Sequence, residues 1–413
     1  MPSRPLTRAR PISDVLDPEL YGRSGYPHDL WAELRRDEPV SWFEGSGIKP
    51  FWALVKHADV ARVSADPATF LSAPRIIAGM VRPSAVRARH LLNMDPPEHG
   101  AYRSLVAGRF TGAAVARLAG RARAVARELV AGISPAGEDI AGGIAGALPV
   151  ALMADLLGLS AGDHARLLDW ANRLSIFSEP DYWSGRSAEE SFAQAEQDLF
   201  DEFSRLSRRR RESPGADLVS LLVAPAPSGQ SLSEQDVLSY CLLLVTAGVE
   251  TATAAISGGV LALAEHPDQY QLLRRHPEWI PTAVEEVLRW TSPVVHFCRT
   301  PVRDVELGGR RIRRGETLAL FYPSANRDEE VFEDPYAFRV DRSPNSHLAF
   351  GTGEHYCLGA QLARLQLREF LTALVEIVAH IELAGAAERV RSSVIGGFRR
   401  LPVRCELGDQ ASA

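Results

Sequence analysis

The segment over residues 350–359, Phe-Gly-Thr-Gly-Glu-His-Tyr-Cys-Leu-Gly, constrains this chain more than any other stretch. Its glycines allow backbone N–H groups to approach the sulfur of Cys357 closely. A helical pattern over residues 358–380 follows at once, so the positive end of a helix dipole lies beside the same sulfur. Both effects favour the thiolate over the thiol, which indicates a reactive or ligating cysteine.

Several chemistries are open to such a thiolate, because it can act as a nucleophile, a zinc ligand or an axial ligand of haem iron. A zinc site needs about four ligands, and His355 and Cys357 supply two, with no Cys-x-x-Cys pair to complete them. A dinucleotide loop is disfavoured because Gly351 and Gly353 are followed by Tyr356 where a third glycine belongs. A buried structural cysteine remains an alternative from this segment alone.

The composition is that of a globular protein. Of the 413 residues, 46% are hydrophobic and 24% are charged, which excludes a disordered chain, a collagen-like fibre and a coiled-coil rod. The net charge of −6 argues against a nucleic-acid binder. Four widely spaced cysteines favour a reducing cytoplasm, and Cys241, Cys298 and Cys405 are expected to fill the core. We expect no signal peptide, membrane anchor or membrane span, because apolar stretches are interrupted before 18 residues.

The order of hydrophobic patterns predicts a mainly α fold with a small β region. A long helix is expected over residues 231–266, from the capping box Ser231-x-x-Glu234 to the residue before Pro267. The other expected elements are strands at 39–42 and 51–55, helices through most of 98–207, a helix at 280–290, strands at 302–307 and 317–322 after a Gly308-Gly309 turn, and a final helix at 358–380.

The middle of the long helix carries three residues of chemical interest. Gly248 weakens a helix by roughly 1 kcal/mol relative to alanine, so its position suggests close approach of the backbone to a flat ligand. Thr251 can donate a hydrogen bond to a backbone carbonyl or a bound oxygen species, and Glu250 can relay protons. The alternative is a weak helical position with a glutamate that faces solvent.

Two spaced pairs lie elsewhere in the chain. Glu286 and Arg289 are three residues apart and therefore share one helix face, although surface pairs of this kind are common and weak. His99 and Arg103 are four apart on a helix that begins after two prolines. Arginine and histidine can bind buried carboxylates, and the alternative is that both are ordinary surface or capping residues.

Together and in this order, the motifs at residues 94–103, 247–251, 286–289 and 350–359 resemble those of the cytochrome P450 family. The resemblance extends from about residue 21 to residue 406. It implies the cytochrome P450 fold, with a flexible N-terminus over residues 1–20 and a single domain over residues 21–413 that encloses haem.

The resemblance also assigns the roles of individual residues. Cys357 would be the thiolate ligand of the iron in haem b, and Glu250 with Thr251 would form the pair that delivers protons to bound dioxygen. The buried Glu286–Arg289 pair would be completed by Arg342, although Arg339 lies close by in the sequence. The residues expected to contact haem or its propionates are His99, Arg103, Gly248, Arg299, Phe350, His355, Cys357 and Gly359.

Family comparison further implies a pocket with an apolar lining that suits an apolar substrate. The protein would insert one atom of O2 into a sterol, lipid, terpenoid or polyketide-like molecule in secondary metabolism, by hydroxylation or epoxidation. The alternatives are the same chemistry on a carrier-protein-tethered acyl or aminoacyl substrate, and a haem protein of this fold without oxygen insertion. The expected lining residues are Ile76, Ile77, Met80, Phe177, Val245, Val249, Val294, Val295 and Ile395.

The chain carries no added cysteine cluster for a fused iron–sulfur domain, so electrons are expected from a separate ferredoxin and ferredoxin reductase. We expect a cytoplasmic monomer that binds neither nucleic acid nor a membrane.

Overall fold

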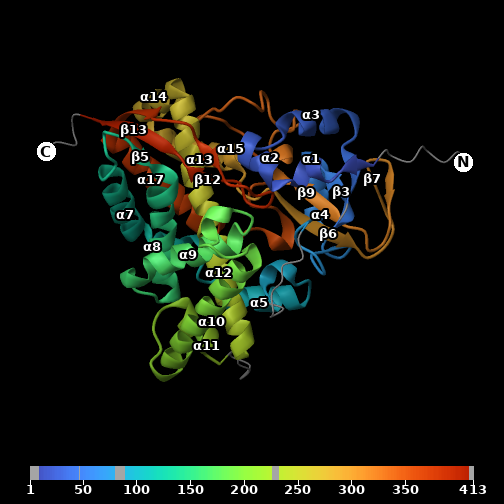
Figure 1. The fold of residues 1–413 in the computed structure, drawn as a ribbon, viewed down its shortest axis with the longest axis horizontal. Helices are drawn as coiled ribbons and strands as arrows, with labels where there is room; N and C mark the ends of the chain where they lie inside the picture. Colours follow the sequence, from blue (N-terminus) through green and yellow to red (C-terminus); the bar gives the residue numbers. More distant parts are fainter. Residues whose placement is uncertain (1–8, 46, 80–88, 226–231, 409–413) are drawn as a thin grey trace, which may run out of the picture.

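The computed structural model describes residues 9–45, 47–79, 89–225 and 232–408. It is mainly helical, which confirms the expected fold class. The N-terminal helices and the large sheet lie on one side, and helices α7–α11 lie on the other (Figure 1). The longer helices are α3 (His28–Asp37), α4 (His57–Ala65), α5 (Glu98–Ala107), α7 (Ala119–Ala131), α8 (Ala145–Leu157), α9 (His164–Ser175), α10 (Ala188–Glu212), α12 (Glu234–Gly248), α13 (Glu250–Glu265), α14 (Pro267–Arg275), α15 (Ile280–Thr291) and α17 (Ala360–Ile377).

Shorter helices connect these elements. The N-terminal segment, expected to be flexible up to residue 20, contains a strand and two of these helices from residue 10 onward, and Val15 and Leu16 are buried. The short helices are α1 (Ser13–Leu16), α2 (Pro18–Ser24), α6 (Gly112–Ala116), α11 (Leu218–Val223), α16 (Tyr322–Ala325), the π-helical turn η2 (Ile140–Ile144) and the 3₁₀ helices η1 (Leu91–Asn93), η3 (Ala161–Asp163), η4 (Pro180–Tyr182), η5 (Pro277–Trp279) and η6 (Gly353–His355).

The strands form one six-stranded sheet and three small sheets. In the six-stranded sheet the order is β1-β2-β3-β9-β6-β4, with β2 and β3 as an antiparallel hairpin and β3 parallel to β9. The expected Gly308-Gly309 turn is confirmed, because it joins the antiparallel strands β7 and β8 with φ of +53° and +68°. The strands are β1 (Arg10–Pro11), β2 (Val40–Gly45), β3 (Ile48–Leu54), β4 (Phe70–Leu71), β5 (Glu138–Asp139), β6 (His296–Pro301), β7 (Val305–Leu307), β8 (Arg310–Ile312), β9 (Leu318–Phe321), β10 (Val378–Leu383), β11 (Glu388–Arg389), β12 (Phe398–Arg400) and β13 (Pro402–Leu407).

The expected long helix at 231–266 is two helices in the structure. The helix is interrupted at Val249, where φ is −98° and ψ is −64°, and α13 begins at the next residue. Residues 247–251 interrupt the apolar run, but helical spacing resumes after them, so the sequence analysis predicted a single helix. The N-terminal prediction is also corrected, because the capping box of α12 is formed by Ser233 and Asp236, whereas Ser231 lies outside the described residues.

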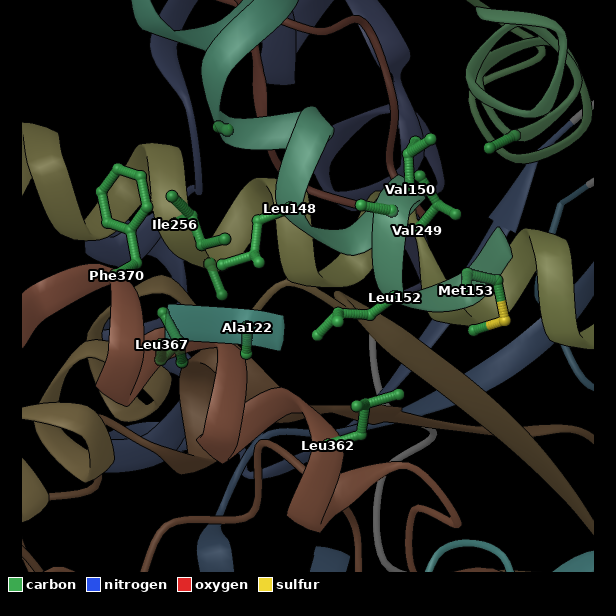
Figure 2. Packing of buried hydrophobic residues seen from close by; sticks show 14 of the residues in the cluster. Ala122, Leu148, Val150, Leu152, Met153, Val249, Ile256, Leu362, Leu367 and Phe370 are labelled. Atoms are coloured by element: carbon green, nitrogen blue, oxygen red, sulfur yellow. The ribbon is translucent and has the colours of Figure 1, made fainter. Parts of the chain in front are cut away.

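The main hydrophobic core lies where α8, α13 and α17 meet. Figure 2 shows Ile256 of α13 between Leu148 of α8 and Phe370 of α17, and Leu152 of α8 and Leu362 of α17 belong to the same cluster. Each such side chain stabilises the fold by about 1.5–3 kcal/mol when it is fully buried. This core holds α13 and the start of α17 in a fixed relation, and both the helix break and the Cys357 segment adjoin it.

Two helical stretches are long and apolar enough to cross a membrane, Ile140–Leu157 and Glu234–Glu265. The sequence analysis expected no stretch of that length. Inside the fold, 67% of the first apolar window and 72% of the second are buried. Such burial is typical of core helices, which need an apolar surface on every side.

Candidate active site

Cys357 lies between η6 and α17, in a loop fixed by its backbone. The Cys357 N–H donates a hydrogen bond of 2.9 Å to the carbonyl oxygen of Phe350, which closes the loop. Gly353 has a φ of +73°, and a Cβ atom there would lie 2.5 Å from the backbone oxygen of Ser64. Only glycine can therefore bring this segment against α4, which contains Ser64.

The surroundings of the Cys357 sulfur have opposite effects on the pKa of the thiol. The nearby Gly359 N–H and the charges of Arg103 and Arg364 lower the pKa of the thiol, as the sequence analysis expected for Gly359. Burial acts more strongly and raises the pKa of Cys357 above its ordinary value. The protein groups alone therefore do not make a stable thiolate, and a bound metal ion would provide the missing positive charge.

Four cationic or imidazole side chains gather near Cys357 from distant parts of the sequence. His99 and Arg103 come from α5, Arg299 comes from β6, and His355 ends η6. The rings of His99 and His355 lie 4.1 Å apart between centroids. Burial and the charges of Arg299 and Arg103 lower the pKa of His355 to about 3. The cluster therefore has a strong positive potential.

This cluster fits the two propionates of a haem. Within the cluster, the Nε2 atom of His99 is buried and has no hydrogen-bond partner among the described residues. The nearest carboxylate oxygen to the other ring nitrogen of His99 is that of Glu354, at 4.0 Å. Two further carboxylates would balance the charge and satisfy the orphaned nitrogen. The described residues contain no group of three metal-binding side chains, so the zinc alternative has no ligand set.

The expected polar pair, Glu250 and Thr251, lies directly after the break between α12 and α13. The hydroxyl of Thr251 donates a hydrogen bond of 2.7 Å to the carbonyl oxygen of Ala247. Glu250 is only 4% exposed, which excludes the alternative of a solvent-facing glutamate. Its Oε1 atom has no partner within the described part of the chain, and burial raises the pKa of Glu250 to about 8. The carboxyl group therefore holds a proton at neutral pH.

Gly248 has a packing role that the sequence did not indicate. A Cβ atom at Gly248 would overlap the Cε atom of Met153 in α8. Figure 2 shows Met153 and Val150 on this face of α8, with Val249 packed beside Val150. A side chain at Gly248 would therefore require the flexible end of Met153 to move, whereas the expected approach to a flat ligand stays a prediction.

Glu286 forms a buried ion-pair cluster. It accepts hydrogen bonds from Arg289 at 2.7 and 2.8 Å and from Arg342 at 3.2 Å. Glu286 and Arg289 have no exposed surface, and Arg342 is 5% exposed. The third member of the trio is therefore Arg342, as expected. Arg339 contributes only its backbone N–H, and its side chain pairs with Asp341 instead.

The expected pocket residues divide into two groups. Three valines have no exposed surface and pack among core side chains in this structure. Met80 lies outside the described residues. The members without exposed surface are Val245, Val249 and Val295, Ile395 is also buried at 9% exposure, and the partly exposed members are Ile76, Ile77, Phe177 and Val294.

The sequence analysis missed Ser72 and Asp95, which support the His355 side of the site through hydrogen bonds. The Oγ atom of Ser72 lies 3.0 Å from Nε2 of His355. The carboxylate of Asp95 accepts hydrogen bonds from the backbone N–H groups of Ser72 and Ala73 at 2.7 and 3.0 Å. Asp95 precedes the two prolines before α5, which was the one available signal. The partnership itself joins segments more than twenty residues apart and has no sequence pattern.

Comparisons with known proteins agree with this geometry. The family described as Cytochrome P450 matches residues 278–377. Steroid C26-monooxygenase of Mycolicibacterium smegmatis is 35% identical over 405 residues, covering 94% of this chain and 93% of that protein. Linalool 8-monooxygenase of Pseudomonas putida is 34% identical over 402 residues, covering 94% of this chain and 98% of that protein.

A solved structure supports the same relationship across the chain. The cytochrome P450 of Mycobacterium marinum in complex with pseudoionone has a TM-score of 0.89 and 32% sequence identity to this chain. The match covers 97% of this chain and 99% of that one. Similarity of this extent, together with the Cys357 loop and the buried Glu286 cluster, shows that the chain belongs to the cytochrome P450 family of monooxygenases.

Proposed function

We propose that this monooxygenase inserts one oxygen atom into an apolar terpenoid- or sterol-like molecule, with haem b held by Cys357. The observation that carries the proposal is the buried carboxyl of Glu250 next to Thr251, whose Oε1 atom has no partner among the described residues, because a protein that only binds a ligand has no use for a stored proton. Both residues lie at the helix break, in the same core that positions the Cys357 segment.

The haem, when bound, supplies the iron centre at which dioxygen is activated. The described residues would bind and orient the haem and deliver protons. Arg103, Arg299, His99 and His355 would bind the propionates through charge and hydrogen bonds and so orient the group. The buried Glu250 carboxyl holds a proton, and the Thr251 hydroxyl can receive and pass it when its bond to Ala247 is released.

The substrate proposal rests on the accessible lining residues and on the relatives. Ile76, Ile77, Phe177 and Val294 present apolar surface, which favours an apolar ligand. The named relatives act on a steroid and on linalool, which are both largely apolar. Hydroxylation or epoxidation of a lipid or a polyketide-like molecule belongs to the same proposal.

Electron supply and cellular setting follow from the same proposal. A separate ferredoxin with its reductase would deliver electrons, and the protein would work as a cytoplasmic monomer formed by one domain. The two bacterial relatives named above are similar in length to this chain, because each match covers more than nine-tenths of both chains.

The test begins with the carbon monoxide spectrum of the reduced protein. The expected result is the strongly red-shifted Soret band of a haem thiolate, which Cys357→Ala abolishes. A screen of terpenoids, sterols, fatty acids and carrier-tethered acyl chains then follows the spectral shift that occurs when a substrate displaces iron-bound water. Product analysis with ¹⁸O2 must show one labelled oxygen. Oxygen consumption without labelled product across the whole panel would contradict the proposal and favour a protein without oxygen insertion.

A further inference from the structure

His296 occupies an unusual position at the start of β6. Its imidazole is completely buried, and it lies between two segments that are far apart in the sequence. Nε2 accepts a hydrogen bond of 3.0 Å from the backbone N–H of Ala78. Nδ1 lies 3.1 Å from the backbone oxygen of Ser393. One side chain therefore joins the 72–79 loop to the 392–396 turn.

The two partners determine the state of the ring. The N–H of Ala78 is a donor, so Nε2 must offer a lone pair, and the carbonyl of Ser393 is an acceptor, so Nδ1 must carry the proton. Only the neutral ring in this tautomer satisfies both partners. Burial lowers the pKa of His296 to about 4, which agrees with a neutral ring at physiological pH. The neighbouring ring of Phe321, 5.4 Å away between centroids, limits its rotation.

Backbone contacts place the same two segments along the strand. The Cys298 N–H donates to the oxygen of Ile76 at 2.9 Å, and the Val295 N–H donates to the oxygen of Val394 at 2.9 Å. Val294 and Ile395 form an antiparallel bridge. The imidazole thus completes a three-part arrangement of loop, strand and turn, and each part carries an apolar residue of the proposed substrate pocket.

We propose that His296 is a positioning residue that sets substrate specificity by fixing the 72–79 loop and the 392–396 turn relative to each other. The proposal rests on the proposed function, because it takes these segments to line the substrate pocket. His296 itself does not contact the reacting atoms. It acts through the positions of Ile76, Ile77 and Ile395.

Three substitutions separate the two hydrogen bonds. In His296→Gln the amide oxygen reaches the place of Nε2 and can accept from Ala78, whereas in His296→Asn the amide nitrogen reaches the place of Nδ1 and can donate to Ser393. His296→Phe keeps an aromatic ring and loses both bonds. The matched control is His266→Phe, because the hydrogen bond of Nδ1 of His266 goes to the backbone oxygen of Ala262, only four residues earlier, and a phenylalanine ring can keep the ring contacts of His266 with Trp290 and Phe338.

The first measurement compares two iron ligands in the haem-loaded protein. Imidazole is small, whereas 4-phenylimidazole extends a phenyl ring into the pocket, so the ratio of their dissociation constants reports the pocket shape. We expect His296→Phe to change this ratio by about tenfold, the effect of about 1.4 kcal/mol, with smaller changes in the Gln and Asn variants. The His266→Phe control should keep the wild-type ratio.

The second measurement is hydrogen exchange of peptides followed by mass spectrometry, which does not depend on activity. The peptide that contains Ala78 should exchange faster in His296→Asn and His296→Phe than in His296→Gln, and the peptide that contains Ser393 should show the reverse order for Asn and Gln. An unchanged ligand ratio in His296→Phe with unchanged exchange of both peptides would overturn the proposal. If the protein bound no haem, the ligand titrations would fail for every variant, but exchange would still decide the role of His296.

Discussion

The buried carboxyl of Glu250 makes a quantitative prediction about stability and pH. Burial raises its pKa from 4.5 to about 8, so the folded protein keeps this proton where the unfolded chain has released it. Stability therefore falls as pH rises from about 4.5 to about 8. At about 1.4 kcal/mol per pH unit, the whole interval corresponds to roughly 5 kcal/mol, and the part between pH 6 and pH 9 to about 3 kcal/mol.

The perturbation is Glu250→Gln, which keeps the shape of the side chain and removes its titration. Other titrating groups are common to both proteins and cancel when the two are compared. The free energy of unfolding of the variant relative to the wild type should rise by about 3 kcal/mol between pH 6 and pH 9. Urea denaturation followed by far-ultraviolet circular dichroism at pH 6, 7, 8 and 9 measures this difference directly.

A second glutamate provides the control. Glu369 is 3% exposed and is paired with Arg123 at 3.0 Å and with Arg368 at 3.2 Å. Glu369→Gln should lower stability through loss of these pairs, and it should not gain stability relative to the wild type toward pH 9. A difference between Glu250→Gln and the wild type that stays constant over the whole pH range would refute the assignment of Glu250 as a buried proton holder.

Three further substitutions test the architecture around the site. Glu286→Gln should lower the free energy of unfolding by about 3–5 kcal/mol in urea denaturation, because its arginine partners stay buried; a loss under 1 kcal/mol would contradict a buried cluster. Gly248→Ala should change the free energy of unfolding by less than about 1 kcal/mol in the same assay, because the overlapping atom is the mobile Cε end of Met153 and alanine favours a helix by about 1 kcal/mol over glycine; a loss above about 3 kcal/mol would show that Met153 cannot move. Gly353→Ala should reduce the haem content of purified protein, measured by pyridine haemochrome, because a Cβ atom 2.5 Å from the Ser64 oxygen must displace the loop; normal haem content would count against that geometry.

Motifs with fixed local spacing could be predicted from the sequence. Helical spacing alone places Glu286 and Arg289 on one face, and the structure shows them paired at 2.7 Å. The third member, Arg342, was expected from the family resemblance, with Arg339 close by in the sequence, because a loop has no repeating geometry from which to choose. In the structure the backbone N–H of Arg339 donates to Glu286, and the side chain of Arg339 pairs with Asp341.

Features that depend on packing against distant segments could not be predicted. Residues 247–251 interrupt an apolar run, but apolar residues at helical spacing lie on both sides, so the pattern indicated one helix with a weak point and not two helices. Met153, nearly one hundred residues earlier, adjoins the glycine before the break. Val295 was expected in the pocket, yet it packs in the core with Phe321. Both neighbours of a strand residue can be apolar when both faces of the strand are buried, so alternation does not identify the face that meets a ligand.

The position of Glu250 at the start of α13 brings two opposing effects together. A helix N-terminus favours a negative charge, but this effect is worth about 0.3–1 kcal/mol, or up to about 2 kcal/mol in partly buried sites. Burial acts in the opposite direction and raises the pKa of Glu250 to about 8, which corresponds to roughly 5 kcal/mol. Desolvation is therefore the larger effect, and the side chain stays protonated beside Thr251. A glutamate at the same helix position but open to solvent would be ionised and would have no proton to deliver at neutral pH, so the packing that buries Glu250 is itself part of the proposed chemistry.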